Sequence, residues 1–302
     1  MNGYFNVNKP TGMSSAAVVA VLRRLTGVQR IGHAGTLDPE AAGVLPVMAG
    51  KATRLFDYLA DKGKEYIAVC AFGVATDTQD ATGTVTETGT GYPDRDTFLR
   101  AAEQLTGEIV QTPSMYSAIK VGGKPLYLRA RRGETVNVPS RIVRIDGIEL
   151  IRTTEEHGFE IRVRCGRGTY IRTLCADLGR LCSCPAHMRS LTRTRSGAFR
   201  IEEAVSLDTL RNAAEEGKLS ELLLPADYPL GHLPRADMPA KSARLVSNGS
   251  KLPLTPETEA LCEGEPVRIY LEGQFWGIAS RRENQLVWNA QIAPEAMPGG
   301  MK

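Results

Sequence analysis

Residues 159–178 read FEIRVRCGRGTYIRTLCADL and contain a strand signal followed directly by a helix signal. In the first seven residues apolar side chains alternate with charged ones, which is the period of a half-buried strand. In the last eight, apolar residues fall at i, i+3, i+4 and i+7, the spacing of one helix face. The turn GRG at 166–168 joins the two elements. Tyr170 and Arg172 are therefore predicted at a strand-to-helix junction, where a rigid scaffold commonly holds functional side chains.

Helix and strand signals alternate outward from this stretch as far as residue 224. Ser14 or Ser15 can cap a helix, and Asp94 can cap another. Residues 65–72 are nearly all apolar after the first and have the composition of a buried strand. This alternation predicts a mixed α/β domain with a sheet at its centre.

The pattern changes after the stretch 225–234, which contains three prolines and a glycine and is predicted to be a linker. Beyond residue 237, short strand signals at 267–271, 275–279 and 286–288 are separated by turns. They predict a second, compact β-rich module.

Length and composition fit one large domain and one small one, with 302 residues of which 42% are hydrophobic and 24% charged. Six cysteines without a secretory signal favour free thiols in a reducing cytoplasm. The apolar stretch 16–22 is far shorter than the ~18 residues of a membrane span, so no membrane role is expected.

The net charge of +3 does not by itself indicate a nucleic-acid-binding protein. The distribution of basic residues is more informative, because they gather in 120–144 and 189–200. The first cluster, which holds the single acid Glu134, comprises Lys120, Lys124, Arg129, Arg131, Arg132, Arg141 and Arg144. Such clusters suit a phosphate backbone. A solvated basic face explains the charge pattern equally well.

Residues 32–46, GHAGTLDPEAAGVLP, carry the densest functional signal. Their glycines and prolines exclude long regular structure, so His33 and Asp38 are displayed on a loop. An aspartate followed by proline can also be a turn-former or a helix cap.

This loop resembles the signature of the TruB-type pseudouridine synthases, in which the corresponding loop holds the catalytic aspartate, here Asp38. Further family motifs follow the same order, namely KPTGMSS at 9–15, KEY at 64–66, GTYIRTL at 168–174 and LTRTRSGAF at 191–199. The C-terminal module, with VRIYL at 267–271 and FWGIA at 275–279, resembles a PUA domain, a small β-barrel found in RNA-modifying enzymes.

The resemblance implies an α+β (mixed α/β) fold. Its catalytic domain, at 1–230, would be built on a central mixed, largely antiparallel sheet with a thumb-like RNA-binding insertion at about 112–140. A PUA-like domain would follow at 237–295.

The reaction that the resemblance implies converts uridine to pseudouridine, and a carboxylate suits it. Asp38 could act as a nucleophile or as a base, and a buried carboxylate stays ionised only when a cation or several donors hold it. Arg172, at a helix start, is the candidate for a bidentate partner of Asp38. Attack at C1′, attack at C6 and a glycal route all remain open.

The resemblance also assigns supporting residues. Tyr66 would stack on the extracted base and exchange protons with it, while Tyr170 would pack against the sugar or against Tyr66. Lys9 would support the fold around the site, and Leu191 would pack against it. The residues expected to contact the RNA are His33, Met115, Tyr116, Lys120, Lys124, Arg131 and Arg132.

The implied substrate is uridine 55 in the T loop of tRNA, with the C-terminal module reaching the acceptor end. We expect a cytoplasmic monomer without a guide RNA, a metal or a cofactor, and a tRNA-folding chaperone activity could accompany catalysis. The spacing of Cys182, Cys184 and His187 fits no common zinc pattern. Gly122-Gly123-Lys124 lacks the other residues of a P-loop.

Three alternatives belong to other functional classes. A non-catalytic RNA-folding protein could keep the fold, but it would not need Asp38, Tyr66 and Arg172 together. A guide-RNA-dependent relative of the dyskerin type would be expected to carry long basic tails. A glycoside hydrolase would need a second carboxylate, for which Glu40 is the nearest candidate.

Overall fold

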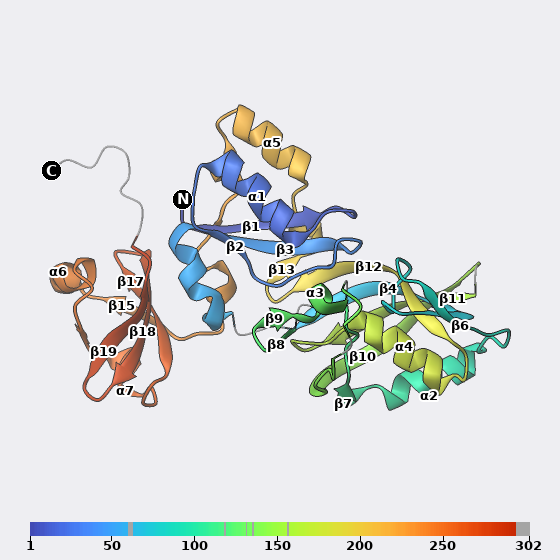
Figure 1. Ribbon diagram of the computed structural model, residues 1–302. Helices are drawn as coiled ribbons and strands as arrows, with labels where there is room; N and C mark the ends of the chain where they lie inside the picture. The colour runs from blue at the N-terminus through green and yellow to red at the C-terminus, as the bar shows by residue number, and fades with distance from the viewer. Residues whose placement is uncertain (60–62, 118, 131, 135, 156, 294–302) are drawn as a thin grey trace. The chain divides into compact units, whose positions relative to one another are not determined.

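The computed structural model describes residues 1–59, 63–117, 119–130, 132–134, 136–155 and 157–293 (Figure 1). It contains two compact units, each assembled from segments distant in sequence. The first comprises Met1–Pro39, Gly43–Asp61 and Gly197–Lys302, and the second comprises Glu40–Ala42 and Lys62–Ser196.

The first unit contains an antiparallel sheet built around β1 (Gly3–Lys9), whose residues are buried except for Asn8. β1 pairs on one side with β3 (Ala42–Ala49) and on the other with β14 (Leu224–Pro225), and β2 (Ile31–His33) adds to β3. The long apolar run of β3 fits a strand that is buried over nearly its whole length.

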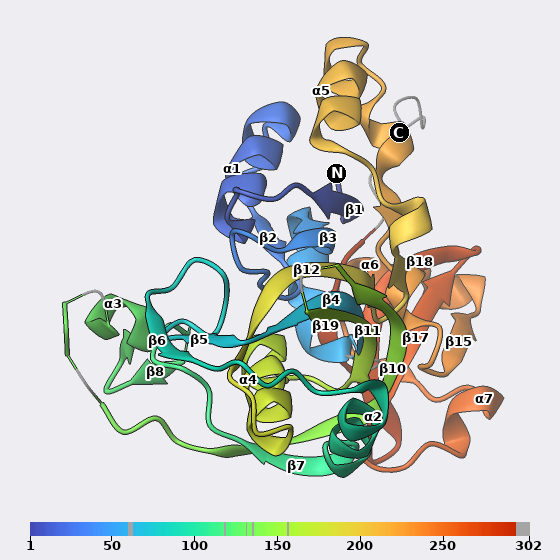
Figure 2. The ribbon, with the colours of Figure 1, turned by 90° about the vertical axis from the view of Figure 1, so that its right-hand side faces the viewer.

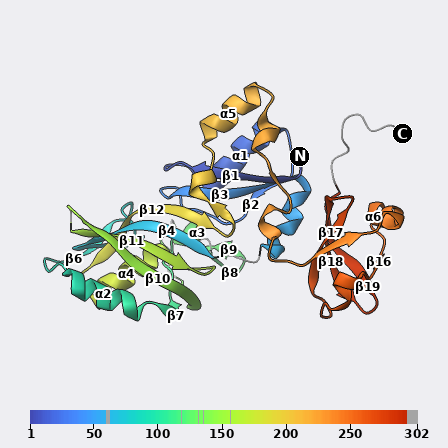
Figure 3. The ribbon, with the colours of Figure 1, turned by 180° about the vertical axis from the view of Figure 1, so that it is seen from behind.

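Two helices, α1 (Ser15–Thr26) and α5 (Leu207–Glu215), lie on one face of these strands (Figures 1 and 3). The Ser14 side chain accepts a hydrogen bond from the Ala17 N–H and caps α1, as the sequence predicts. The remaining short elements of this part are η1 (Gly50–Tyr58), β13 (Phe199–Arg200), η2 (Ile201–Glu203), η3 (Leu219–Leu222) and η4 (Tyr228–Leu230).

The second unit contains a five-stranded antiparallel sheet in the order β12-β4-β11-β10-β7. Its strands are β12 (Ala186–Ser196), β4 (Lys64–Phe72), β11 (Gly158–Cys165), β10 (Arg141–Thr154) and β7 (Gly107–Gln111). The predictions of a buried strand at 65–72 and an alternating strand at 159–165 are confirmed.

Helices α2 (Arg95–Gln104) and α4 (Ile171–Leu181) cover one face of this sheet (Figure 2). The Phe98 ring of α2 packs against the rings of Phe72 and Phe159. The Cys70 thiol of β4 lies 3.7 Å from the Cys175 carbonyl oxygen of α4. Tyr66 and Leu191 belong to the same sheet face, because side chains two residues apart in a strand, or directly opposite in neighbouring strands, point to one side.

Two small hairpins extend from the second unit. One consists of β5 (Val74–Thr76) and β6 (Val85–Thr88). The other lies in the segment predicted as a thumb and consists of β8 (Lys120–Val121) and β9 (Lys124–Pro125), followed by α3 (Leu126–Ala130).

The C-terminal residues of the first unit form a curled five-stranded sheet in the order β15-β17-β18-β19-β16 (Figure 3). The β15–β17 pair is parallel and the others are antiparallel. The elements are β15 (Arg235–Met238), η5 (Ala240–Ser242), α6 (Ala243–Ser247), β16 (Leu252–Pro253), α7 (Pro256–Glu259), β17 (Pro266–Leu271), β18 (Gln274–Arg282) and β19 (Gln285–Gln291). The predicted α+β class with a small C-terminal β-module is therefore confirmed.

The stretch 225–234 differs from the linker that its prolines predict. It contains the end of β14 and the short helix η4, and Leu230 is completely buried. Ala226 and Leu230 belong to a core cluster that also includes Tyr4 and Ile278. The apolar side chains between the prolines therefore anchor this stretch by packing.

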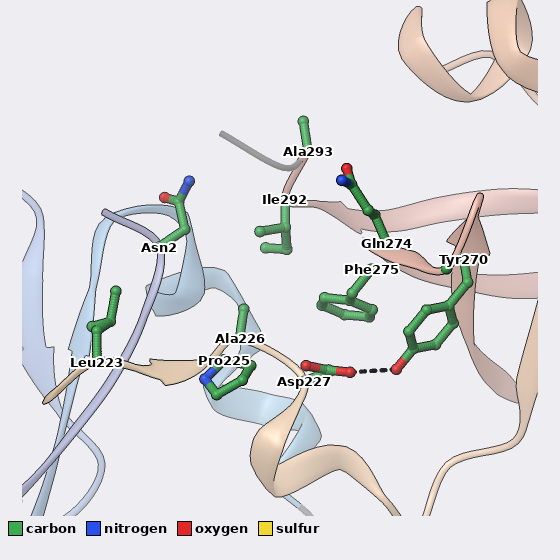
Figure 4. A pocket seen from close by; sticks show the side chains of 11 residues that line it. Asn2, Leu223, Pro225, Ala226, Asp227, Tyr270, Gln274, Phe275, Ile292 and Ala293 are labelled. Atoms are coloured by element: carbon green, nitrogen blue, oxygen red, sulfur yellow. Dashed lines mark hydrogen bonds between the residues drawn. The ribbon is translucent and has the colours of Figure 1, made fainter. Parts of the chain in front are cut away.

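The same region borders an open hollow of about 370 Å³ (Figure 4). Pro225, Phe275 and Ile292 line it, and the Tyr270 hydroxyl donates a hydrogen bond to the Asp227 carboxylate at its edge. Burial and this hydrogen bond raise the pKa of Tyr270 to about 12, so its phenol stays protonated at neutral pH.

Candidate active site

The loop that carries Asp38 is fixed from α1 on the N-terminal side of the aspartate. The buried Ser15 hydroxyl accepts a hydrogen bond from the Leu37 N–H at 2.8 Å and lies 3.0 Å from the Leu37 carbonyl oxygen. The Leu37 side chain is itself buried. Leu37 is thus held by both its backbone and its side chain, immediately before Asp38.

Lys9 holds the same loop on the C-terminal side of Asp38. Its ammonium group donates hydrogen bonds to the carbonyl oxygens of Pro10 at 2.8 Å, Met13 at 2.5 Å and Pro39 at 2.9 Å. Lys9 is 0% exposed, and three acceptors match the three N–H bonds of the ammonium. The desolvation cost of this buried charge is offset by hydrogen bonds that fix the backbone beside Asp38.

The Asp38 side chain remains partly exposed between these two anchors. His33 lies in the same unit, at the end of β2 opposite Val47, and its ring is half-buried. The loop therefore presents the Asp38 carboxylate on a backbone that is constrained at both neighbouring residues.

Tyr66 and Leu191 lie in the second unit, on the sheet face that α4 covers. Tyr66 is 5% exposed and pairs with Val163 in β11 and with Arg193 in β12. Leu191 pairs with Ala68. Both side chains are buried on one face of a rigid sheet.

A buried glutamine holds the start of α4. The Gln111 side chain accepts a hydrogen bond from the Tyr170 N–H at 3.0 Å and donates one to the Tyr170 carbonyl oxygen at 3.3 Å. Tyr170 is the N-cap residue and makes no side-chain capping hydrogen bond, and Gln111 pairs with its backbone N–H and carbonyl oxygen. The Arg141 guanidinium lies 5.4 Å from the centre of the Tyr170 ring.

Arg172 projects from the first turn of α4 and is 6% exposed. Its Nη1 donates to the Thr78 carbonyl oxygen at 3.1 Å and lies 3.5 Å from Oδ2 of Asp80. Its Nη2 donates to the Tyr116 carbonyl oxygen at 2.9 Å. The planar guanidinium therefore joins the turn at 77–83 to the base of the thumb segment.

The turn at 77–83 is a part of the site that sequence reasoning missed. Asp80 accepts hydrogen bonds from the Thr78 hydroxyl and from both the N–H and the hydroxyl of Thr82. Gln79 has a φ of 65° and accepts a hydrogen bond from the Thr173 hydroxyl of α4. The run TDTQDATG at 76–83 was the available signal, because Asp and Thr side chains stabilise turns by bonding nearby backbone groups.

The expected RNA contacts in the thumb differ in their surroundings. Met115 and Tyr116 are half-buried, and the Tyr116 hydroxyl donates a hydrogen bond to Asp77 at 3.1 Å, which raises the pKa of Tyr116. Lys124 and Arg132 are exposed. Lys120 lies in β8, and Arg131 lies outside the described residues.

Within the residues that the structure describes, no three His, Cys, Asp or Glu side chains are grouped so that they could hold a metal ion. In the Cys182–His187 segment, His187 Nδ1 lies 2.8 Å from the Val74 carbonyl oxygen, and burial raises the pKa of Cys182 to about 11. None of the helices in the described ranges is long and apolar enough to cross a membrane.

Comparison with known proteins assigns a family to this fold. Residues 23–171 match the model of the N-terminal domain of TruB family pseudouridylate synthases. Residues 172–231 match the model of the tRNA pseudouridylate synthase B C-terminal domain.

Similar full-length proteins cover most of the chain. It is 43% identical over 286 residues to tRNA pseudouridine synthase B of Geobacillus kaustophilus, a match covering 91% of this chain and 99% of that protein. The corresponding protein of Aromatoleum aromaticum is 42% identical over 278 residues, with 92% of this chain and 88% of that protein covered.

Among solved structures, a chain of a Cbf5-Nop10-Gar1 complex superposes with a TM-score of 0.70 at 26% identity, covering 98% of this chain and 85% of that one. Sequence and fold agree, and the chain belongs to the TruB family of pseudouridylate synthases.

Proposed function

We propose that the protein is a stand-alone tRNA pseudouridine synthase that isomerises uridine 55 of the T loop, with Asp38 as its catalytic group. The observation that carries this proposal is the double anchoring of the Asp38 loop by Ser15 and Lys9. A catalytic carboxylate has to meet one carbon atom with little freedom of position, and a fixed backbone provides that. The similarity to proteins named tRNA pseudouridine synthase B supports the choice of RNA.

The proposed reaction breaks the N1–C1′ bond, turns the base over and joins C5 to C1′. C5 loses a proton, N1 gains one, and no atom is consumed. Asp38 would supply the nucleophile or the base. Tyr66 would stack on the rotating base, Tyr170 would pack at the sugar, and Leu191 would limit the space around the base.

We further propose that Arg172 is the cationic partner of the Asp38 carboxylate. Its burial and its contacts with Thr78 and Tyr116 support this role, because they orient the guanidinium before substrate binds. Preorganised charge is the most effective form of electrostatic catalysis, since it costs no reorganisation at the moment of reaction.

Extruding a base from a folded tRNA costs a few kcal/mol, which other contacts must offset. We propose that the thumb segment at about 112–140 supplies part of the binding free energy that offsets this cost. The residues involved would be the exposed Lys124 and Arg132, together with Met115, Tyr116, Lys120 and Arg131. His33 would help to hold the flipped nucleotides. The C-terminal domain, at 237–295, would bind the acceptor end.

The remaining parts of the proposal concern the setting of the reaction. The protein would act as a monomer in the cytoplasm without a guide RNA or a cofactor, and it could also assist tRNA folding. The domain limits proposed above, 1–230 and 237–295, would separate catalysis from distal binding.

The decisive experiment uses an unmodified tRNA transcript tritiated at uridine C5, with no guide RNA and no added metal. Wild type should release tritium from the T-loop uridine, and Asp38→Asn should not. If wild type binds the tRNA tightly but releases no tritium, the stand-alone synthase is excluded and a binding or guide-dependent role replaces it.

A further inference from the structure

Lys64 lies at the start of β4 and two residues before Tyr66, so both side chains belong to the same face of the sheet. In the neighbouring strands, Lys64 pairs with Cys165 and with Ser196, and Tyr66 pairs with Arg193. Arg193 is completely buried. A lysine and an arginine therefore flank the tyrosine that is expected to receive the base.

The surroundings of Lys64 are positive. Burial lowers its pKa to about 8, and the charges of Arg193 and Arg167 act in the same direction, opposed only by the Cys165 thiol. Glu65 belongs to the opposite face, where it accepts a hydrogen bond from the Thr194 hydroxyl. Across the described part of the chain, no carboxylate forms an ion pair with the Lys64 ammonium.

Lys9 and Lys64 thus differ in the hydrogen-bond partners of their ammonium groups. Lys9 donates to three carbonyl oxygens, whereas no hydrogen bond to a described residue compensates the burial of Lys64. A half-buried cation beside other cations, without an internal acceptor, costs free energy in the free protein. Binding of an anion stabilises such an arrangement, and every nucleotide of an RNA chain contributes an anionic phosphate.

We propose that Lys64 binds a phosphodiester of the RNA next to the uridine that Tyr66 receives, in surroundings that the neighbouring Arg193 makes positive. This inference rests on the proposed function and adds a binding residue to it. The ammonium is a compact point charge that can meet a phosphate oxygen from several directions. The contact would fix the backbone next to the flipped nucleotide, where a small displacement would misplace C1′.

A pH dependence follows from this contact. A bound phosphate raises the pKa of Lys64 above its value in the free protein, so RNA binding takes up a proton. Affinity is therefore full below pH 8 and weakens as the pH rises past it. The groups that face Lys64 are Arg193 of β12, Cys165 of β11 and Arg167 of the following turn, and burial raises the pKa of Cys165 to about 11.

The test is a double-mutant cycle between one side chain and single phosphates. A T-arm stem-loop RNA carries a neutral methylphosphonate at one position at a time around the target uridine. Its Kd is measured for Asp38→Asn, which prevents turnover, and for Asp38→Asn with Lys64→Met. The full-length chain is used throughout.

Lys64→Met should weaken binding of the unmodified RNA about tenfold or more, the loss typical of one charge-assisted hydrogen bond. At one phosphate near the target the two changes should be non-additive, because both remove the same contact. The difference in affinity between the two proteins should shrink from pH 7 to pH 9. Lys218→Met, at an exposed lysine paired with Glu216, should change none of these.

Additive losses at every phosphate tested, or a pH-independent difference, would overturn the proposal. A merely structural role is excluded by thermal unfolding, because replacing an uncompensated buried charge with an apolar side chain should leave the Tm unchanged or raise it. If wild type releases tritium while the cycle is additive, only the Lys64 assignment fails. Absence of tritium release would instead contradict the proposed function.

Discussion

At the scale of single residues, hydrogen-bond partners distinguish side chains that look alike in the sequence. Lys9 and Lys64 each stand in a recognisable motif near an expected catalytic group. Only the contacts show that Lys9 is a structural donor with three acceptors, while Lys64 has positive neighbours. The two lysines should therefore respond in opposite ways to loss of their charge.

Lys9→Met should destabilise the protein by about 1–3 kcal/mol, because it leaves three carbonyl oxygens without their charged donor. Urea unfolding measures this change, with Lys64→Met as the comparison. In single-turnover assays Lys9→Met should also slow the reaction, since the Asp38 loop loses its anchor at Pro39. Unchanged stability would show that the ammonium is not the donor that holds this loop.

Arg172→Lys keeps the positive charge but cannot reach the Thr78 and Tyr116 carbonyl oxygens together. We expect kcat to fall about a hundredfold, in the range for loss of one preorganised electrostatic group. Arg180→Lys, on the exposed side of the same helix, keeps the ion pair with Asp177 and should behave like wild type. Near-normal turnover of Arg172→Lys would contradict the proposed role of Arg172 in catalysis.

At the scale of elements, the position of α4 depends on close packing of Gly179 against Cys184 and Ala186, which follow the helix in the sequence. A Cβ atom added at Gly179 would lie 2.6 Å from the Cβ of Ala186 and 2.7 Å from the Cys184 carbonyl oxygen. At Gly179, the helix that carries Arg172 therefore has no space for an added methyl group.

Gly179→Ala should destabilise the protein by about 1–3 kcal/mol, the usual cost of overpacking. Gly231→Ala is the matched control, because nothing lies within 4 Å of the added Cβ and its φ of −56° suits alanine. Chemical denaturation of the two variants gives the comparison. Equal stabilities would mean that α4 can shift freely away from β12.

The thumb segment should act mainly through charge. Replacing the exposed Lys124 and Arg132 with glutamine should lower the slope of log Kd against log salt by about 0.7–0.9 for each phosphate that the protein no longer neutralises. Arg211→Gln, at an exposed arginine paired with Asp208 on α5, should leave the slope unchanged. A salt-independent affinity of the wild type would contradict a thumb that grips phosphates.

At the scale of the whole molecule, the C-terminal sheet shares its core with the N-terminal strand β1. Ile278 belongs to the cluster of Tyr4 and Leu230, whereas Leu286 belongs to a cluster formed within 236–286. The Asn289 amide also donates to the Tyr58 hydroxyl. The small module is therefore packed into the first unit and is not attached by a chain connection alone.

Ile278→Ala should speed amide hydrogen exchange in β1 as well as in β17–β19, because its cavity opens in the shared cluster. Leu286→Ala removes an equally buried side chain and should affect the C-terminal strands alone. Exchange changes restricted to residues 235–293 in both variants would show that the module unfolds independently.

The sequence by itself determined the family, the order of most elements and the loop that displays Asp38. The family follows from the resemblance of the ordered motifs, whereas the elements and the loop depend on local periods, caps and glycine-rich turns, which act over a few residues. Only the tertiary structure decided which residues form hydrogen bonds with one another across the chain. Arg172 meets Thr78 and Tyr116 across 94 and 56 positions, and Gln111 holds Tyr170 across 59. The proline-rich stretch 225–234 became packed structure for the same reason, because long-range burial outweighs local turn chemistry once a core forms.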